Sequence, residues 1–355
     1  MRVLTRAGLA ALLAVSLLPL AEAPAAAAGR ARVLRCKGGT CWPAAFTFTP
    51  DGGAIFYAER LTGEIRRFTF EGRKDRRWAK LADVSQRGEQ GVLGIALDPD
   101  WEQGPRQQWV YVYYTEGHPH RNVIVRLRKR GGRGVKHDRL VTIPASDYHD
   151  GGVLHFGPDD KLYAVTGDSQ SPGLAQRKGS HAGKVLRLEQ NGKRPGDNPI
   201  PNSRAYTYGH RNSFGFAFDP QTGRVWQSEN GPECDDEVNL ILPGRNYGWG
   251  GASSCPDIND SGPNPERPKA TFNPVPALTG VAFCQACGLA PEVEGDLLVG
   301  AYLDGKIRNL TLNPARDGIA SIEVLYDHPN SVLAVEAAPD GRVYFSDSHG
   351  IFLLR

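Results

Sequence analysis

A loose internal repeat is the feature that most constrains the fold of this chain. Each copy has a turn of the Pro-Asp-Gly type or a variant of it, a strand, a second turn and a further strand that often ends in Arg-x-hydrophobic. The six copies begin at residues 49–52, 98–100, 157–159, 219–223, 294–296 and 338–341. They take up about 54 residues each, close to the roughly 40 to 50 residues of known four-stranded propeller blades. The repeat therefore predicts an all-β protein, a six-bladed β-propeller of four-stranded antiparallel blades.

The hydrophobic pattern agrees with this fold class. Helical periodicity is almost absent, and short alternating apolar runs are bounded by Gly, Pro and Asp, as in strands joined by tight turns. One blade cannot bury both of its faces, whereas a ring of blades packs face to face and leaves few exposed edges. A two-sheet sandwich is the alternative, but it would not ordinarily need about 24 strands. We expect the strand that ends at Arg355 to close the ring against an early N-terminal strand.

The N-terminus has the three regions of a secretory signal. Two arginines within the first six residues precede a largely apolar run over residues 9–20, and four alanines follow at 25–28. The apolar run is too short to cross a bilayer comfortably, and no later segment has the roughly 20 apolar residues that a spanning helix needs. We therefore expect a signal peptide over residues 1–28, a single propeller domain over 29–355, and an exported protein without a membrane span.

The charge balance argues against a nucleic-acid partner. The formal net charge is +3, with both signs interspersed, whereas a phosphate backbone requires a concentrated basic face. The one basic cluster, residues 126–133, contains two glycines and predicts a solvated loop.

Six cysteines in an exported chain favour disulfides over free thiols. Six cysteines permit 15 pairings, and proximity in the sequence favours one of them. The expected pairs are Cys36 with Cys41, Cys234 with Cys255, and Cys284 with Cys287. A zinc site at Cys284-Gln-Ala-Cys287 is the alternative for the last pair, but it would need two further ligands nearby.

Three segments carry side chains suited to chemistry. Tyr148–Gly152 places a histidine before paired glycines, Tyr208–Gly215 holds an arginine and an asparagine in a run without strand alternation, and Ser228–Asn239 is an acidic, carbonyl-rich turn. Histidine suits proton transfer near neutral pH, and a guanidinium suits paired oxygens. Calcium takes carboxylate and carbonyl oxygens. Taken alone, each segment also has a non-functional interpretation. The histidine could be merely solvated, the arginine could form an inter-blade salt bridge, and the acidic run could be an ordinary surface turn.

Together, and with Gly88–Gly94, these segments resemble the soluble quinoprotein sugar dehydrogenases, the glucose/sorbosone dehydrogenase family. The resemblance implies a PQQ- and calcium-dependent oxidoreductase that oxidises the anomeric carbon of aldose sugars. The partners that it implies are a small-molecule sugar and an artificial or natural electron acceptor, and we expect a monomer or a homodimer. It makes His149 the catalytic base and Arg211 the group that polarises the reactive carbonyl of the cofactor. It also places Glu89, Arg211 and Asn212 against the cofactor. Without the resemblance, Gly88–Gly94 would mark only a close approach of two blades.

The same resemblance implies two calcium sites. The main-chain carbonyls of Gly231 and Pro232 would hold the ion that carries the cofactor. Glu237 and Tyr247 would be ligand positions of a second, structural ion.

The C-terminal part departs from the family pattern. PQQ carries three carboxylates, and the resemblance implies cations where this chain has Asp304, Ser331 and Leu333. Lys306 and Arg308 share a strand face with Asp304, and we hypothesise that they partly substitute. The departure keeps open a non-catalytic calcium-binding propeller that binds glycans or proteins. A calcium-dependent lactonase is a third interpretation, against which the retained His149 argues.

Overall fold

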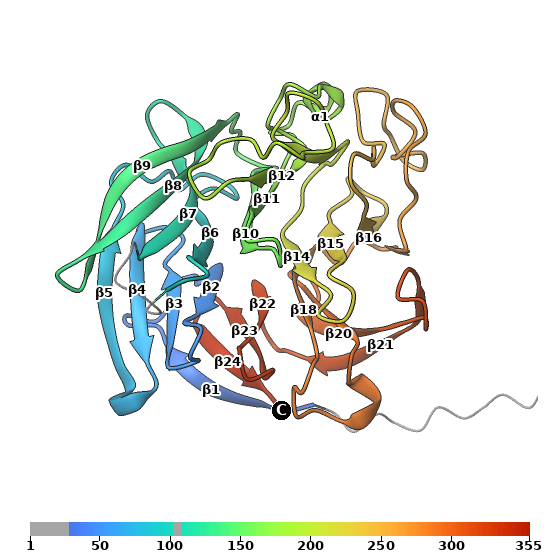
Figure 1. Ribbon diagram of the computed structural model, residues 1–355. Helices are drawn as coiled ribbons and strands as arrows, with labels where there is room; N and C mark the ends of the chain where they lie inside the picture. Colours follow the sequence, from blue (N-terminus) through green and yellow to red (C-terminus); the bar gives the residue numbers. More distant parts are fainter. Residues whose placement is uncertain (1–27, 102–107) are drawn as a thin grey trace, which may run out of the picture.

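The computed structural model describes residues 28–101 and 108–355, and the predicted signal segment up to residue 27 lies outside them. Six four-stranded antiparallel sheets are arranged as a ring, which confirms the predicted six-bladed propeller and excludes the sandwich (Figure 1). The helical elements within the described ranges are α1 (Pro172–Gln176) and two short 3-10 turns, Glu71–Arg73 and Pro291–Val293. None of these has the length to span a bilayer, and the described residues contain no longer helix.

Each blade runs outward from its innermost strand. The first consists of β2 (Ala45–Phe48), β3 (Ala54–Ala58), β4 (Glu64–Thr69) and β5 (Lys74–Lys80). The second consists of β6 (Val92–Leu97), β7 (Trp109–Glu116), β8 (Arg121–Arg130) and β9 (Arg133–Ile143). The third consists of β10 (Gly151–Phe156), β11 (Leu162–Thr166), β12 (Lys184–Leu188) and β13 (Ala205–Tyr208).

The remaining three blades follow the same order. The fourth consists of β14 (Gly215–Phe218), β15 (Val225–Glu229), β16 (Asp236–Ile241) and β17 (Ala270–Phe272). The fifth consists of β18 (Leu278–Phe283), β19 (Leu297–Ala301), β20 (Lys306–Leu312) and β21 (Ile319–Asp327). The sixth consists of β22 (Ala334–Ala337), β23 (Val343–Asp347), β24 (Gly350–Leu354) and β1 (Arg30–Arg35).

The sixth blade closes the ring with strands from both ends of the chain. Strand β1 pairs antiparallel with β24, so the blue N-terminal strand lies beside the red C-terminal one (Figure 1). Just beyond the ladder, the N–H of Gly29 donates to the carbonyl of Arg355 at 2.5 Å, and the N–H of Arg355 donates back at 2.9 Å. The expected closure at Arg355 is confirmed.

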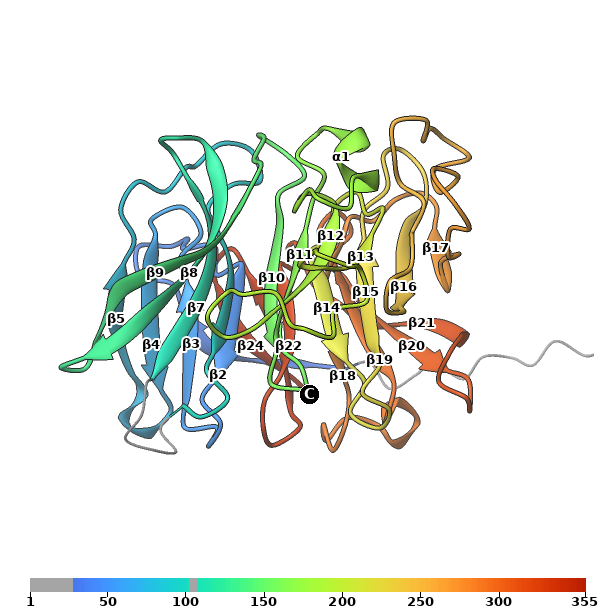
Figure 2. The ribbon, with the colours of Figure 1, turned by 45° about the horizontal axis from the view of Figure 1, so that its top comes forward.

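The sequence repeat is offset by one strand from the blade. Every one of the six repeat turns joins the first strand of a blade to its second, as residues 49–52 join β2 to β3. Because neighbouring strands are antiparallel, all six turns lie at one end of the ring. The connections between blades, and those between second and third strands, lie at the other end. Figure 2 shows α1, a connection between second and third strands, at the top and the C-terminus at the bottom.

The apolar core is divided among the interfaces between neighbouring blades. The second strands β3, β7, β11, β15, β19 and β23 are buried along their whole length, since each has a strand on both sides and a blade against both faces. Between the first two blades, Phe56 lies 5.3 Å from both Trp78 and Trp101, edge to face. Such aromatic pairs each contribute about 0.5 to 1.5 kcal/mol beyond their burial. This packing gives the loops above it a rigid base.

The prediction of a solvated loop over residues 126–133 was wrong. Residues 126–130 belong to β8, and only Gly131 and Gly132 form the turn to β9. Arg126 Nε donates to Asp138 on β9 at 2.8 Å, and the Arg126 guanidinium lies 4.2 Å from the Trp109 ring. Arg126 therefore pairs with a carboxylate on β9 and packs on a ring of β7, contacts that the sequence of residues 126–133 alone did not reveal.

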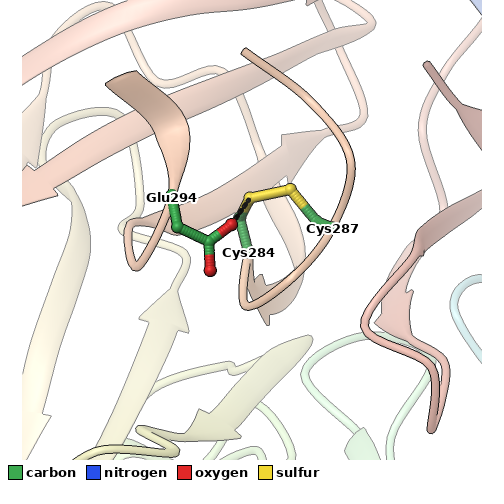
Figure 3. Close-up of side chains that lie close together, drawn as sticks. All are labelled: Cys284, Cys287 and Glu294. Carbon is green, nitrogen blue, oxygen red and sulfur yellow. Dashed lines mark hydrogen bonds between the residues drawn. A yellow bond between two sulfur atoms is a disulfide. The ribbon is translucent and has the colours of Figure 1, made fainter. Parts of the chain in front are cut away.

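All three predicted disulfides are present: Cys36–Cys41, Cys234–Cys255 and Cys284–Cys287. Figure 3 shows the last of them with the Glu294 carboxylate beside it. This trio is the one group of three His, Cys, Asp or Glu side chains within the described part that is close enough to hold a metal. Both sulfurs are bonded to each other, so the zinc alternative was wrong.

Candidate functional site

The predicted site residues come together at the end of the ring opposite the repeat turns. Glu89 lies between β5 and β6, His149 between β9 and β10, and Arg211 with Asn212 between β13 and β14. All three are connections between blades, so the strand directions bring them to the same mouth of the ring. The turn at Gly231, between β15 and β16, opens at that end as well.

The carboxylate of Glu89 ties these loops to one another. Its Oε2 accepts a hydrogen bond from the His149 N–H at 2.7 Å and one from Asn212 Nδ2 at 3.1 Å. Asn212 Oδ1 in turn accepts from the N–H of Gly151 at 3.2 Å. His149 has a positive φ of 64° and Gly151 one of 63°, so the chain turns sharply on both sides of Asp150. Three inter-blade connections are thus fixed by two side chains.

The imidazole of His149 is held from behind. Its Nδ1 lies 2.8 Å from Oδ1 of Asp168, which follows β11 and is fully buried. The second oxygen of Asp168 accepts a hydrogen bond from Trp249 Nε1 at 2.7 Å. A carboxylate at Nδ1 fixes the tautomer that carries its proton there. Nε2 is then the nitrogen that is free to accept a proton.

Asp150, the next residue, is a buried carboxyl group. Its Oδ1 accepts from Asn122 Nδ2 at 2.6 Å and from the N–H of Ser146 at 3.2 Å. Its Oδ2 is buried without a hydrogen-bond partner. Burial raises the pKa of Asp150 to about 7. The group supports the His149 loop from below and does not face the mouth.

Arg211 is half-buried, and its guanidinium lies 5.4 Å from the Trp249 ring. Nη1 donates to the carbonyl of Asn230 at 2.9 Å, and the main-chain N–H donates to Glu229 Oε1 at 2.5 Å. The Nε atom is buried without a partner. Burial lowers the pKa of Arg211, but a guanidinium remains charged at any ordinary pH. The fold therefore leaves one donor of this guanidinium unpaired.

A cavity of about 340 Å³, the mouth cavity, opens between these loops. Among its lining residues are Trp42, Arg60, Glu89, Tyr148, Asn230 and Tyr302. Tyr148 and Tyr302 are large side chains that remain exposed, at 51% and 38%, so they offer aromatic surface to a ligand. Buried polar atoms without partners gather at or beside this cavity: Arg60 Nε, Arg211 Nε and Asn230 Oδ1. An aromatic, polar and anionic molecule such as PQQ fits this set of donors and rings.

The Gly231 turn is suited to a cation bound by carbonyl oxygens. It curls so tightly that a Cβ on Gly231 would lie 2.0 Å from the carbonyl oxygen of Cys234 and 2.5 Å from that of Asp235. The Gly231 N–H donates to Asp236 Oδ1 at 3.0 Å, which fixes the turn to the first residue of β16. The Cys234–Cys255 disulfide anchors the turn from below. Glycine is required here by space, and Pro232 fixes the next φ.

Glu237 and Tyr247 lie deeper in the fourth blade. Glu237 is 2% exposed and faces Glu229 directly across the β15–β16 ladder. Burial and the nearby Glu229 raise the pKa of Glu237, and its two carboxylate oxygens accept hydrogen bonds from Asn239 Nδ2 at 3.0 Å and from Asn259 Nδ2. The Tyr247 hydroxyl donates to the Leu240 carbonyl at 2.6 Å and accepts from the Leu242 N–H at 2.8 Å. A metal role for Tyr247 therefore falls to its main-chain carbonyl.

The positions that depart from the family pattern face the same mouth. Asp304, Ser331 and Leu333 line a second cavity of about 330 Å³, the side cavity, which shares Trp42 and Leu333 with the mouth cavity. They offer it no cation. Beside them, Arg308 forms an ion pair with Asp304.

Two residues of the site were missed by the sequence interpretation. Asp168 follows a strand in a Thr-Gly-Asp turn that matches no motif, and only the structure places it behind His149. Arg60 sits in the Glu-Arg start of a polar turn between β3 and β4, which composition alone assigns to solvent. The position of Arg60 relative to the repeat turns could have identified it. It lies on a connection between the second and third strands of a blade, and these connections lie at the same end of the ring as the predicted site residues.

Comparisons with a family model and with curated relatives point to the same family. The family described as Glucose / Sorbosone dehydrogenase matches residues 41–354. Quinoprotein glucose dehydrogenase B of Acinetobacter calcoaceticus is 33% identical over 255 residues, 62% of this chain and 52% of that protein, so the match spans about half of that relative. Aldose sugar dehydrogenase YliI of Escherichia coli is 28% identical over 337 residues, 85% of this chain and 86% of that protein.

Solved structures agree over nearly the whole chain. The PQQ-bound form of aldose sugar dehydrogenase from Streptomyces coelicolor has a TM-score of 0.79 at 28% identity, covering 94% of this chain and 99% of that one. A putative oxidoreductase (glucose dehydrogenase) from Thermus thermophilus has the same TM-score of 0.79 at 32% identity, covering 92% of this chain and 100% of that one.

Proposed function

The chain belongs to the glucose/sorbosone dehydrogenase family, and from this premise we propose that it oxidises the anomeric carbon of aldose sugars with PQQ and calcium. The observation that carries the proposal is the arrangement of His149. Its Nδ1 is occupied by Asp168, and its main chain is bound by Glu89, a residue that lines the mouth cavity and also binds Asn212. A base with one free nitrogen thus stands beside Tyr148 and Glu89 at the border of a cavity that Arg60 lines.

Oxidation of an aldose to its lactone removes a proton from the C1 hydroxyl and a hydride from C1. PQQ, when bound, supplies the two-electron acceptor that takes the hydride. The role of His149 is to accept the hydroxyl proton at Nε2, while the buried Asp168 stabilises the imidazolium that forms. Glu89 and Asn212 hold the base at a fixed place relative to Arg211.

The residues that would hold PQQ are those with unpaired donors and exposed rings. Arg211, whose Nε has no hydrogen-bond partner, would contact a quinone or carboxylate oxygen, and Asn212 and Glu89 belong to the connections beside it. Tyr148 and Tyr302 offer flat surfaces to the planar cofactor or to the sugar. The carbonyls of Gly231 and Pro232 are the proposed ligands of the calcium that carries the cofactor, and Glu237 with the Tyr247 carbonyl those of a structural ion.

We also propose that the protein is exported. The charged, apolar and small-residue regions of residues 1–28 and the three disulfides support this. The electron acceptor would then be an extracytoplasmic carrier. Light scattering of the purified protein would distinguish a monomer from a homodimer. In our proposal the mouth of the ring stays open in either state.

The test is reconstitution of the purified protein with calcium and PQQ, followed by reduction of an artificial dye with a panel of aldoses. Dye reduction that requires sugar, calcium and PQQ, and that His149→Ala abolishes while leaving PQQ uptake intact, is the expected result. Uptake of PQQ without turnover of any aldose would contradict the proposed reaction. Hydrolysis of lactones without the quinone would point to the lactonase instead.

A second function is favoured by one observation. Asp304, Ser331 and Leu333 give the side cavity no cation toward a cofactor with three carboxylates. A non-catalytic propeller that keeps the calcium turn and binds glycans or proteins would need no such cations. Failure of the protein to take up PQQ at micromolar concentration, together with calcium-dependent binding to a glycan array, would favour this second function.

A further inference from the structure

The charge of Arg60 has no partner that the fold provides. Arg60 lies between β3 and β4 and lines the mouth cavity. Throughout residues 28–101 and 108–355, no carboxylate forms an ion pair with it. Its one side-chain hydrogen bond runs from Nη1 to the main-chain carbonyl of Glu89 at a long 3.3 Å, and its Nε is buried without a partner. Burying a guanidinium in this way costs free energy unless an anion arrives.

The surroundings fix Arg60 in place and keep the nearest carboxylate from it. The Arg60 main chain donates to the Trp42 carbonyl at 3.0 Å and accepts from the Val92 N–H at 2.8 Å, which joins the first blade to its neighbours. The carboxylate of Glu89 is turned the other way, toward His149 and Asn212. Arg60 is therefore presented to the cavity and not neutralised by it.

The approach of Arg60 depends on a glycine. Gly91 has a φ of 136°, and a Cβ there would lie 2.4 Å from the Arg60 carbonyl oxygen and 2.6 Å from Arg60 Cγ. Beneath the guanidinium, the Trp42 ring lies 5.3 Å away, in cation–π contact. Trp42 and Arg60 are both among the residues that line the mouth cavity, so this guanidinium can meet a ligand there. A planar fork of this kind matches a carboxylate bidentately.

We propose that Arg60, stacked on Trp42, binds a carboxylate of PQQ and so replaces the cations that the fifth and sixth blades lack. The inference rests on the proposed PQQ dependence. It assigns the anion-binding role to the first blade and not to Arg308, whose charge is already paired with Asp304. The mouth cavity, lined by Arg60 and bordered by Arg211, would then meet the trianion with two guanidinium groups from different blades.

The test measures PQQ affinity by quenching of tryptophan fluorescence in the calcium-loaded protein, without any turnover. Arg60→Gln is expected to weaken binding roughly ten- to a hundredfold, since a charge-assisted pair is lost. Arg60→Lys should weaken it less, because a point charge keeps the attraction without the fork. The matched control is Arg67→Gln, which removes another first-blade guanidinium that lies 5.7 Å from an aromatic ring, that of Phe56. It should bind as the parent does.

A ligand variant separates charge recognition from a structural effect. The trimethyl ester of PQQ keeps the rings and quinone but has no carboxylates, so the parent should prefer PQQ strongly over the ester. Arg60→Gln should narrow that preference, whereas Arg67→Gln should leave it unchanged.

The outcomes are distinct. Equal affinity of the parent and Arg60→Gln for PQQ would overturn the inference and leave the proposed function standing, as would an unchanged preference over the ester or a loss shared by Arg67→Gln. Loss in Arg308→Gln with none in Arg60→Gln would assign the cation to the fifth blade. No PQQ uptake by the parent would remove the proposed function, and the inference with it.

Discussion

His149 Nδ1 lies 2.8 Å from Oδ1 of Asp168, a carboxylate that is fully buried and has its other oxygen bound by Trp249. The imidazole is thus held by a group that cannot turn away from it. Orientation and tautomer of the base are set by the third blade, and not by the substrate. This relationship makes Asp168 a positioning residue for the proposed base.

Asp168→Asn should lower kcat roughly 10²- to 10⁴-fold with little change in KM or in PQQ affinity. An amide at this place can donate to Nδ1 and so favour the tautomer in which Nε2 carries the proton and cannot accept another. Trp249→Phe is the matched control, because it removes only the other hydrogen bond to Asp168 and keeps the ring beside Arg211. The prediction fails if Asp168→Asn retains most of the parental kcat, or if its loss lies in KM alone.

Glu89→Gln should tighten PQQ binding, on the order of three- to tenfold, measured by fluorescence titration. The amide oxygen can still accept from the His149 N–H and from Asn212 Nδ2, while a negative charge at the mouth cavity is removed. Glu89→Ala should do the opposite, since it releases both hydrogen bonds and loosens the loops. If the Gln variant weakened binding as much as the Ala variant, repulsion between Glu89 and the cofactor would not be the controlling effect.

Asp150 should make stability depend on pH. Burial raises its pKa from 3.8 to about 7, so between these values the folded protein holds a proton that the unfolded chain has lost. The free energy of unfolding therefore falls as the pH rises from about 4 to about 7, by at most about 4 kcal/mol. Asp150→Asn has no proton to lose, so urea unfolding from pH 4.5 to 8 should show a flatter profile. An unchanged slope would show that Asp150 ionises normally in the folded state.

Removing the Cys234–Cys255 disulfide should lower stability by about 3 kcal/mol, because the bond closes a loop across a sequence separation of 21 residues. The double variant Cys234→Ser with Cys255→Ser should also need more calcium to bind PQQ, since the bond anchors the Gly231 turn. Cys284→Ser with Cys287→Ser is the control: it opens a loop with a separation of only 3 residues, between β18 and β19 at the opposite end of the ring. Thermal unfolding and calcium titration measure the two effects. A control variant with the same rise in calcium requirement would contradict the assigned role.

The fold was predictable because its signal is local and repeated. Each turn of the Pro-Asp type is a short-range feature, and six of them along one chain leave few architectures besides a ring. The closure by β1 followed from the ring itself, since a last blade with three strands needs a fourth. The basic run at Arg126 was misjudged because its partners, Asp138 and Trp109, are brought to it by strand pairing and not by neighbouring sequence.

The site was predictable only in part, for a related reason. His149, Arg211 and Gly231 belong to sequence segments that resemble motifs of the family, so they could be identified from the sequence. Asp168 and Arg60 act through single side chains whose roles exist only when loops from different blades meet. No pattern of residue types near Arg60 in the sequence indicates that its charge is unpaired. Whether a carboxylate lies beside Arg60 depends on which loops the folded ring brings to it.

The meeting of Gly29 and Arg355 makes the order of blades cyclic in space although it is linear in sequence. A circular permutant, with the two old termini joined by a short linker and new ones opened between Gly131 and Gly132, would keep every blade interface intact. In the natural connectivity, by contrast, β1 is synthesised first. Its partner strand β24 is synthesised only after five complete blades. The sixth sheet is thereby the last to be completed, and a truncation that removes β24 leaves β1 without its partner strand and the ring open.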